Sequence, residues 1–223
     1  MKVSNVDYPP NGVANFAIML MLMSLRKAGH ILKRGELQDY SLKGKIGRDI
    51  SNCTVGVIGT GRIGQTVLKH LSGFGCELLA YDLYQNDEVK KIAKYVPLET
   101  LIAESDVITL HTNATEENHH LLNADAFAKM KDGTILINTA RGGLIVEEAL
   151  VDALQSGKVY GAGLDVIRDE PPKGDNPLLH QDNAAITAHI AWLPRASRLR
   201  AIDIAIDNFK AYLRGEPVSV INK

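Results

Sequence analysis

Three ionisable residues, Arg141, Glu170 and His189, each follow a short apolar run that predicts a buried strand. Histidine exchanges a proton near neutral pH, and a carboxylate beside it orients the ring and stabilises its protonated form. Arginine matches a carboxylate ligand with its planar fork of donors. Each residue also has an ordinary interpretation, as a surface cation, a turn residue or a core histidine. Their shared place after predicted strands favours proton transfer beside a bound carboxylate.

A glycine-rich turn opens the part of the chain that would position these residues. Residues 54–58 predict a strand buried on both faces, and the G-x-G-x-x-G run from Gly59 to Gly64 follows it. Gly59 permits the tight turn, Gly61 lets a pyrophosphate approach the backbone, and Gly64 lets the next helix lie close to the strand. That helix, predicted over residues 62–74, directs its positive dipole end toward the phosphates.

The second strand of this unit supports the same interpretation. Residues 78–81 predict a strand that ends in Asp82, roughly 20 residues after the glycine turn, where a carboxylate can accept hydrogen bonds from ribose hydroxyls. A carboxylate at this position disfavours a 2′-phosphate. The sequence therefore predicts a dinucleotide site that takes NAD rather than NADP.

Strands and helices alternate along the rest of the chain. The predicted strands cover residues 106–111, 134–138, 161–166 and 184–187, and the predicted helices cover residues 98–104, 123–130, 146–156 and 194–214. This alternation predicts an α/β fold with a doubly wound parallel sheet of the Rossmann type. Ligands bind such sheets at the carboxyl ends of the strands, where the three ionisable residues stand.

Three further motifs carry a resemblance to a known family. They are Asn138-Thr-Ala-Arg-Gly-Gly143, Leu164-Asp-Val-Ile-Arg-Asp-Glu-Pro171 and Thr187-Ala-His-Ile-Ala-Trp192. Together with the glycine turn they closely resemble the D-isomer-specific 2-hydroxyacid dehydrogenases, in the order in which that family has them. The resemblance implies hydride transfer between NAD(H) and a small 2-oxo acid or D-2-hydroxy acid of the lactate, glycerate/hydroxypyruvate or glyoxylate class.

The resemblance also implies roles for individual residues. Arg141 would bind the 2-oxo acid, His189 would be the acid/base, and Glu170 would support His189. The cofactor contacts that it implies, together with those from the glycine turn, come from Gly59, Gly61, Arg62, Ile63, Gly64, Asp82, Thr112, Asn113, Asn118, Thr139, Ala140, Arg141, Asp165 and His189. Asp165 would touch the nicotinamide carboxamide, and Thr139 and Ala140 would contribute backbone contacts.

Relatives in this family begin with a substrate-binding lobe, of which this chain shows only an end. We expect residues 1–12 to be a remnant of that lobe, residues 13–190 to form the NAD-binding domain, and residues 191–223 to hold a terminal helix that would return to the substrate lobe. The second lobe would then be incomplete, cofactor binding would survive, and turnover would be weak or absent.

A Met- and Leu-rich stretch predicts one long helix over residues 13–33. Because its first half is apolar nearly all round, something must cover it, either its own domain or a second copy of the chain. We expect a homodimer through this helix. A rival interpretation of the whole chain is a non-catalytic NAD-binding module that dimerises or acts like a corepressor.

Bulk composition excludes several partners. The 223 residues are 45% hydrophobic and 23% charged, with a formal net charge of −1, which offers no electrostatic attraction for nucleic acid or an anionic membrane. The apolar run at residues 16–23 is too short to span a bilayer, and no signal peptide is visible, which predicts a cytoplasmic protein. Cys53 and Cys76 are expected to be buried free thiols, and no metal site is expected.

Overall fold

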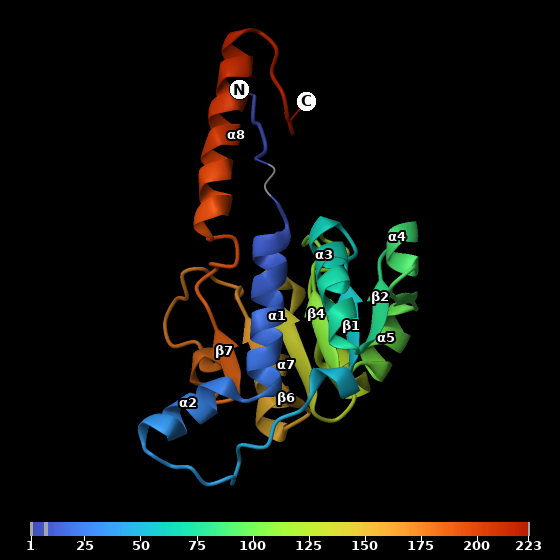
Figure 1. Ribbon diagram of the computed structural model, residues 1–223, viewed down its shortest axis with the longest axis vertical. Coiled ribbons are helices and arrows are strands. Elements are labelled where there is room, and N and C mark those ends of the chain that lie inside the picture. The colour runs from blue at the N-terminus through green and yellow to red at the C-terminus, as the bar shows by residue number, and fades with distance from the viewer. Residues whose placement is uncertain (1, 7–8, 223) are drawn as a thin grey trace.

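A parallel sheet forms the centre of the molecule in the computed structural model, which describes residues 2–6 and 9–222 (Figure 1). Within those residues seven strands pair in the order β3-β2-β1-β4-β5-β6-β7, every pair parallel. The strands are β1 Thr54–Ile58, β2 Glu77–Tyr81, β3 Lys94–Tyr95, β4 Val107–Leu110, β5 Thr134–Asn138, β6 Val159–Leu164 and β7 Ala184–Ile186. The predicted fold class is confirmed.

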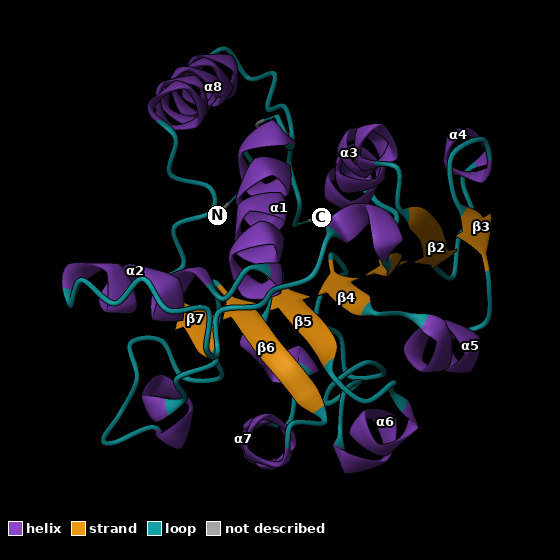
Figure 2. Ribbon diagram, turned by 60° about the horizontal axis from the view of Figure 1, so that its bottom comes forward, coloured by secondary structure: helices purple, strands orange, loops and turns teal. Residues whose placement is uncertain are grey.

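Helices cover both faces of the sheet (Figure 2). One face carries α1 Asn11–Leu25 and α3 Arg62–Leu71, and the other carries α5 Leu98–Glu104, α6 Ala124–Lys129 and α7 Glu147–Ser156. The short α4 Asp87–Lys90 lies beside the edge strand β3. The described residues also hold four short 3-10 turns: Ile50–Asn52, Ser72–Phe74, Gly142–Leu144 and Pro177–His180.

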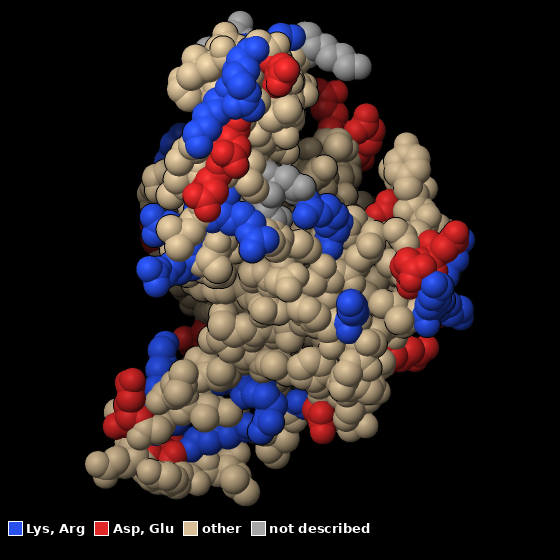
Figure 3. All heavy atoms as spheres, turned by 45° about the horizontal axis from the view of Figure 1, so that its top comes forward, with Lys and Arg blue, Asp and Glu red and all other residues tan. Residues whose placement is uncertain are grey.

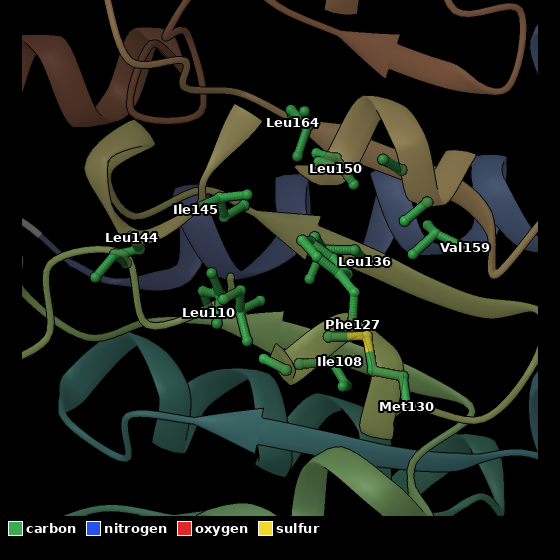
Figure 4. Packing of buried hydrophobic residues seen from close by; sticks show 14 of the residues in the cluster. Ile108, Leu110, Phe127, Met130, Leu136, Leu144, Ile145, Leu150, Val159 and Leu164 are labelled. Carbon is green, nitrogen blue, oxygen red and sulfur yellow. The ribbon is translucent and has the colours of Figure 1, made fainter. Parts of the chain in front are cut away.

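Each face of the sheet has its own hydrophobic core, because successive strand residues point to opposite faces. In β5, Ile135 and Ile137 pack beneath α1 and α3, whereas Leu136 packs toward α6 and α7. Figure 4 shows the second core, in which Phe127 and Met130 meet the side chains of β4 and β5. The sheet is therefore a rigid layer, and the loops at its carboxyl edge start from fixed positions.

The helix predicted over residues 13–33 is two helices. After α1 the backbone turns at Lys27, whose φ of 52° is left-handed, and α2 Ala28–Glu36 starts in a new direction. The apolar residues of α1 pack on β5, β6 and α3 of the same chain, while α2 has no buried residue. The cover that the sequence required for α1 is its own sheet.

The last helix, α8 Arg195–Leu213, projects beyond the sheet beside the N-terminal segment (Figure 1). Ser4 bridges to Val220, and the Asn208 side chain donates to the Asn5 carbonyl. The helix exposes a set of large apolar side chains: Leu199, Ile202, Ile206, Phe209, Tyr212 and Leu213. The three-part division of the chain stays a prediction, and residues 1, 7 and 8 of the first part lie outside the described residues.

The surface charge, the two thiols and the helix lengths bear on the remaining predictions. On the face drawn in Figure 3, basic and acidic side chains lie in small groups of both signs rather than in one field. Cys53 is buried and Cys76 half-buried, both are free as predicted, and burial raises the pKa of both thiols. Among the helices of the described residues, none combines the length and apolarity needed to cross a bilayer.

Candidate active site

A pocket of about 170 Å³ opens at the carboxyl edge of the sheet. It lies where the chain order reverses between β1 and β4, the place at which doubly wound sheets bind ligands. Its lining residues follow β1, β4, β5, β6 and β7, with one contribution from α1: Val13, Ile63, His111, Thr112, Asn113, Thr139, Ala140, Arg141, Asp165, His189, Ala191 and Trp192. Eight of the predicted site residues are therefore together.

The glycine turn beside this pocket has the geometry that its sequence predicts. Gly59 has a φ of 91°, and a Cβ there would lie 2.7 Å from the backbone of His111 and Thr112. A Cβ on Gly64 would lie 1.9 Å from the Gly59 carbonyl oxygen, so only glycine lets α3 start this close to β1. A Cβ on Gly61 would meet nothing within 4 Å, which leaves open space over the backbone at the helix N-terminus. This cradle fits a pyrophosphate.

Asp82 stands at the end of β2, directly beside the glycine turn. One carboxylate oxygen accepts hydrogen bonds from the Thr60 backbone N–H at 2.6 Å and from its hydroxyl at 3.2 Å. The other accepts from the Tyr84 backbone N–H at 3.0 Å. The carboxylate is half-buried and retains lone pairs, so it can also accept from ribose hydroxyls.

The loop after β4 carries three of the predicted cofactor contacts, Thr112, Asn113 and Asn118, and only the first two line the pocket. Asn118 does not line it; its side chain donates to the Asn113 carbonyl at 2.7 Å and accepts from the Thr115 N–H at 2.8 Å. Asn118 therefore holds the loop in shape.

The turn after β5 presents Arg141. The buried Asn138 donates to the Arg141 carbonyl and accepts from the Ala140 N–H, both at 2.9 Å. The exposed Arg141 guanidinium donates to the Ala140 carbonyl at 2.6 Å and reaches the pocket. An asparagine at the end of a strand that bonds its own turn is a local sequence signal for such a turn.

Asp165 follows β6 and is almost fully buried. Its carboxylate accepts from the Thr187 hydroxyl at 2.6 Å and from the backbone N–H groups of Ile190 and Ala191 at 2.9 and 2.8 Å. Its carbonyl accepts from the His189 N–H at 2.8 Å. Asp165 thus fixes the loop that carries His189, and its contact with a carboxamide stays a prediction.

His189 and Glu170 form the pair that their types suggested. Nδ1 of His189 lies 2.6 Å from Oε2 of Glu170, and the second Glu170 oxygen accepts from the Ile167 N–H at 3.0 Å. His189 has a left-handed φ of 54°, and Trp192 Nε1 donates to its carbonyl at 2.9 Å. Because Nδ1 faces the carboxylate, Nε2 is the nitrogen left to exchange a proton in the pocket.

Several residues at the site were not assigned a role from sequence. His111 lines the pocket, and burial lowers the pKa of its imidazole to about 3. Trp192 forms another part of the wall. The buried Glu147 accepts from the Arg168 N–H and from the Asn176 side chain, which anchors the loop carrying Glu170. No local sequence pattern indicates this role of Glu147, because its two partners lie 21 and 29 residues further along the chain.

The remaining predicted contacts lie beside the pocket. Gly59, Gly61 and Gly64 form the turn, and Arg62 opens α3 with an exposed side chain. No group of three or more His, Cys, Asp or Glu side chains in the described residues could hold a metal ion. A Rossmann-type sheet, a phosphate cradle and a histidine–carboxylate pair beside an arginine define a class, the nicotinamide-dependent oxidoreductases.

Comparisons with known proteins narrow this class. A family model described as the D-isomer specific 2-hydroxyacid dehydrogenase NAD binding domain matches residues 18–191. A hydroxypyruvate reductase from Blautia hydrogenotrophica is 44% identical over 236 residues, covering 100% of this chain and 72% of that protein.

Solved structures agree. A D-lactate dehydrogenase from Treponema pallidum superimposes with a TM-score of 0.94 at 34% identity, over 100% of this chain and 72% of that one. A D-lactate dehydrogenase from Aquifex aeolicus, complexed with NAD and lactic acid, gives a TM-score of 0.91 at 34% identity, over 97% and 70%.

The chain belongs to the D-isomer specific 2-hydroxyacid dehydrogenases. The predicted cofactor, NAD, and the predicted reaction class, NAD-linked interconversion of 2-oxo acids and D-2-hydroxy acids, are confirmed by this membership. The non-catalytic alternative gains no support from the comparisons.

Proposed function

We propose that this protein reduces a small 2-oxo acid to its D-2-hydroxy acid, with Arg141 binding the substrate carboxylate and His189 donating a proton from Nε2 to the substrate carbonyl oxygen. Glu170 accepts from Nδ1–H, fixes the tautomer and stabilises the imidazolium form. NADH, when bound, supplies the hydride. The observation that carries the proposal is the 2.6 Å contact between His189 and Glu170 beside a pocket that Arg141 lines.

The cofactor contacts belong to the same proposal. Gly59, Gly61, Arg62 and Gly64 would hold the pyrophosphate, supported by the open backbone at Gly61. Asp82 would accept from the adenosine ribose. The nicotinamide side would be formed by Ile63, Thr112, Asn113, Thr139, Ala140, Arg141, Asp165 and His189, which share the pocket lining, with Asn118 holding the loop.

The size of the pocket supports a small substrate. About 170 Å³ suits a substrate of pyruvate, hydroxypyruvate or glyoxylate size beside the nicotinamide ring, and the similar proteins named hydroxypyruvate reductase and D-lactate dehydrogenase act on acids of this class. Within it we propose pyruvate and hydroxypyruvate as the first candidates.

The test is a paired assay of cofactor binding and turnover on one preparation. Trp192 is the only tryptophan in the sequence and lines the pocket, so its fluorescence should be quenched as NADH binds, with energy transfer to the cofactor. NADH oxidation is then followed with each of the three oxo acids, and the product is resolved into D and L forms.

Turnover that yields the D product and falls on Arg141→Met supports the proposal, and Arg168→Met, which removes an exposed arginine paired with Glu148, is the matched control. Binding without turnover on any oxo acid would contradict the catalytic part and favour the non-catalytic module.

We also propose a homodimer through residues 13–33, extended by the segment after them. Within this chain α2 buries no residue, and Met19 on the outer side of α1 is 41% exposed. The following segment carries four large apolar side chains that are 72–88% exposed: Leu37, Tyr40, Leu42 and Ile46. A hollow of about 390 Å³ at the α1–α2 junction could receive them from a second copy.

Sedimentation of the purified protein tests this dimer. We expect a two-chain mass that falls toward one chain when Leu37 and Tyr40 are both replaced by Ser. Replacement of Leu199 and Tyr212 on α8 by Ser removes exposed apolar residues from a different surface and is the control. A monomer at every concentration would contradict the dimer.

The division of the chain follows from the same proposal. Residues 13–190 would form the NAD-binding domain, and the segments 1–12 and 191–223 would belong with the substrate lobe. The antiparallel bridge between Ser4 and Val220 supports treating the two end segments as one unit.

A further inference from the structure

The loop that carries Glu170 is tied at two points to a buried carboxylate that the proposed proton transfer does not use. Glu147 is the first residue of α7 and is 5% exposed. Its Oε1 accepts from the Arg168 backbone N–H at 2.6 Å, and its Oε2 accepts from the side-chain amide of Asn176 at 3.0 Å. One carboxylate therefore joins a point before Glu170 to a point after it in the sequence.

The hydrogen bonds of Glu147 and Glu170 start from neighbouring backbone groups. The Ile167 N–H donates to Oε1 of Glu170 at 3.0 Å, and the N–H of the next residue, Arg168, donates to Glu147. The other oxygen of Glu170 lies 2.6 Å from Nδ1 of His189. Because each peptide group is a rigid plane, a displacement of Arg168 would also move the N–H group that holds Glu170.

The turn of Arg141 packs on the same stretch of backbone. A Cβ on Gly142 would lie 2.0 Å from the carbonyl carbon of Ile167 and 2.5 Å from the nitrogen of Arg168. The stretch therefore has no room to move toward the Arg141 turn, and the bonds to Glu147 resist its displacement. Glu147 thus acts on the place where the Arg141 turn and the Glu170 loop meet.

A carboxylate at this position could simply complement the dipole of α7, whose N-cap, Val146, makes no side-chain cap. Glu148 can do so in the same turn of the helix while it stays exposed, with its side chain 67% accessible and paired with the Arg168 guanidinium at 2.8 Å. A dipole role therefore needs no burial. Burying a carboxylate is unfavourable unless it is hydrogen-bonded, and the bonds that Glu147 makes are directed at the Glu170 loop.

We infer that Glu147 is a positioning residue for proton transfer. By tying Arg168 and Asn176 together, it holds Glu170 against Nδ1 of His189, which keeps Nε2 directed into the pocket. This inference rests on the proposed function, because it assigns a support to the acid/base pair of that function. Glu147 does not line the pocket and exchanges no proton.

The experiment exchanges the polarity of the contact between Glu147 and Asn176. Glu147→Gln leaves one acceptor and puts an NH₂ group in place of the other. Asn176 cannot adapt by turning its amide over, because its Oδ1 already accepts from the Leu178 N–H at 2.9 Å. The amide introduced by Glu147→Gln can therefore satisfy Arg168 or Asn176, but not both.

The second variant, Asn176→Asp, keeps the bond to the Leu178 N–H and places a carboxylate against that of Glu147. The double variant restores a matched pair, because the introduced amide can donate to the introduced carboxylate and still accept from the Arg168 N–H. The control is Glu148→Gln, which breaks the exposed pair with the Arg168 side chain and leaves the buried contacts in place.

We expect each single variant to lower kcat for 2-oxo acid reduction about 3- to 10-fold, because one hydrogen bond of the support is lost. The Kd for NADH, measured by quenching of Trp192, and the KM for the oxo acid should stay within about twofold, since the binding groups are unchanged. The double variant should return kcat to within about twofold of the wild type, and Glu148→Gln should leave it there.

A second measurement separates positioning from a general loss of stability. In a chain that already carries Glu170→Gln, the further change Glu147→Gln should lower kcat by less than about twofold, because the contact that it positions is already impaired. A general disturbance would instead multiply the two losses. Urea unfolding of each variant verifies that the assayed protein is folded.

An unchanged kcat in both single variants would overturn the inference. A double variant slower than either single variant would do the same, and so would losses that multiply fully with Glu170→Gln. The proposed function is distinguished by the wild type and by Glu170→Gln. A wild type without turnover on any 2-oxo acid would remove the proposed function together with this inference, whereas turnover that falls in Glu170→Gln but in neither single variant would overturn this inference alone.

Discussion

Two histidine–carboxylate pairs lie within about ten residues of each other along the chain, and they differ in what holds them. His189 contacts Glu170 at the pocket, where both its backbone N–H and its carbonyl are bonded. His180, the last residue of the 3-10 turn Pro177–His180, contacts Asp175 with side chains 64% and 86% accessible, against 43% and 33% for the first pair. The chemical groups are alike, and only the first pair lies beside a pocket.

The two pairs differ in the hydrogen bonds that hold their surroundings. Asp165 fixes the loop of His189 through Thr187, Ile190 and Ala191, and Glu170 is tied to the Ile167 N–H. An exposed ion pair without such supports contributes little to stability and holds no fixed direction. Matched substitutions in the two pairs measure how much the supports matter.

The largest effect is expected at the histidines. His189→Ala should lower kcat for 2-oxo acid reduction by about 10²- to 10⁴-fold, because it removes the proposed general acid. His180→Ala should leave kcat within about twofold, since its ring lies outside the pocket. Steady-state oxidation of NADH at saturating substrate measures both, and a comparable loss in the two variants would refute the contrast.

The carboxylates should show a smaller contrast. Glu170→Gln should lower kcat about 10- to 100-fold, the cost of one hydrogen bond to a charged group, with little change in KM for the oxo acid. Asp175→Asn should change neither constant. The same assay separates kcat from KM, and an unaltered kcat in Glu170→Gln would mean that the pair does not stabilise the imidazolium.

The third comparison is between two aspartates at opposite edges of the sheet, Asp165, which holds the His189 loop, and Asp106. Asp165→Asn should lower the free energy of unfolding by about 1–3 kcal/mol and kcat/KM by about tenfold, because one carboxylate accepts three hydrogen bonds there. Asp106 accepts from the Thr54 N–H at 2.8 Å and pairs with Lys131 at the opposite edge.

Asp106→Asn should therefore cost stability without loss of activity. Urea unfolding followed by the fluorescence of Trp192 gives the free energies, and the NADH assay gives kcat/KM. Equal losses of activity in the two variants would show that overall stability, and not the His189 loop, controls turnover.

The smallest effect concerns His111, whose buried imidazole stays neutral well below pH 6.5. Its folded pKa of about 3 lies below the ordinary 6.5, so the unfolded chain binds the extra proton between these values. Stability then falls as the pH is lowered through this window, by up to about 2 kcal/mol between pH 6.5 and 5. His111→Asn should remove that part of the slope, which urea titrations at several pH values detect. An unchanged slope would mean that His111 does not set it.

The sequence allowed the fold to be predicted well where local signals are strong. The β-branched strand at residues 54–58, the glycine turn and the helix after it appear with nearly the expected bounds, although α3 ends at Leu71 and continues as a 3-10 turn. The break at Lys27 was missed because nothing in a lysine announces a left-handed φ. The short β3 was missed because two residues show no periodicity.

The candidate site could be predicted only in part, because its supporting contacts join residues far apart in the sequence. Residues with reactive groups, such as Arg141 and His189, stand out by type and place. The groups that hold them do not, because Glu147 and Asp165 act through partners about 20 to 30 residues away, and such contacts depend on how loops pack. The same limit hid whether α1 is covered by its own sheet or by a second copy.

The strand order has a consequence for the order in which parts of the protein can fold during synthesis. The glycine turn lies between β1 and the helix that leads to β2 and packs against the start of the loop after β4, whereas the loop of His189 needs β6 and β7, made later in the chain. During synthesis the phosphate cradle can form on the growing chain well before the acid/base exists, since domains fold from contacts available at the time. We therefore expect the proposed acid/base site to be completed last, when β7 docks on β6.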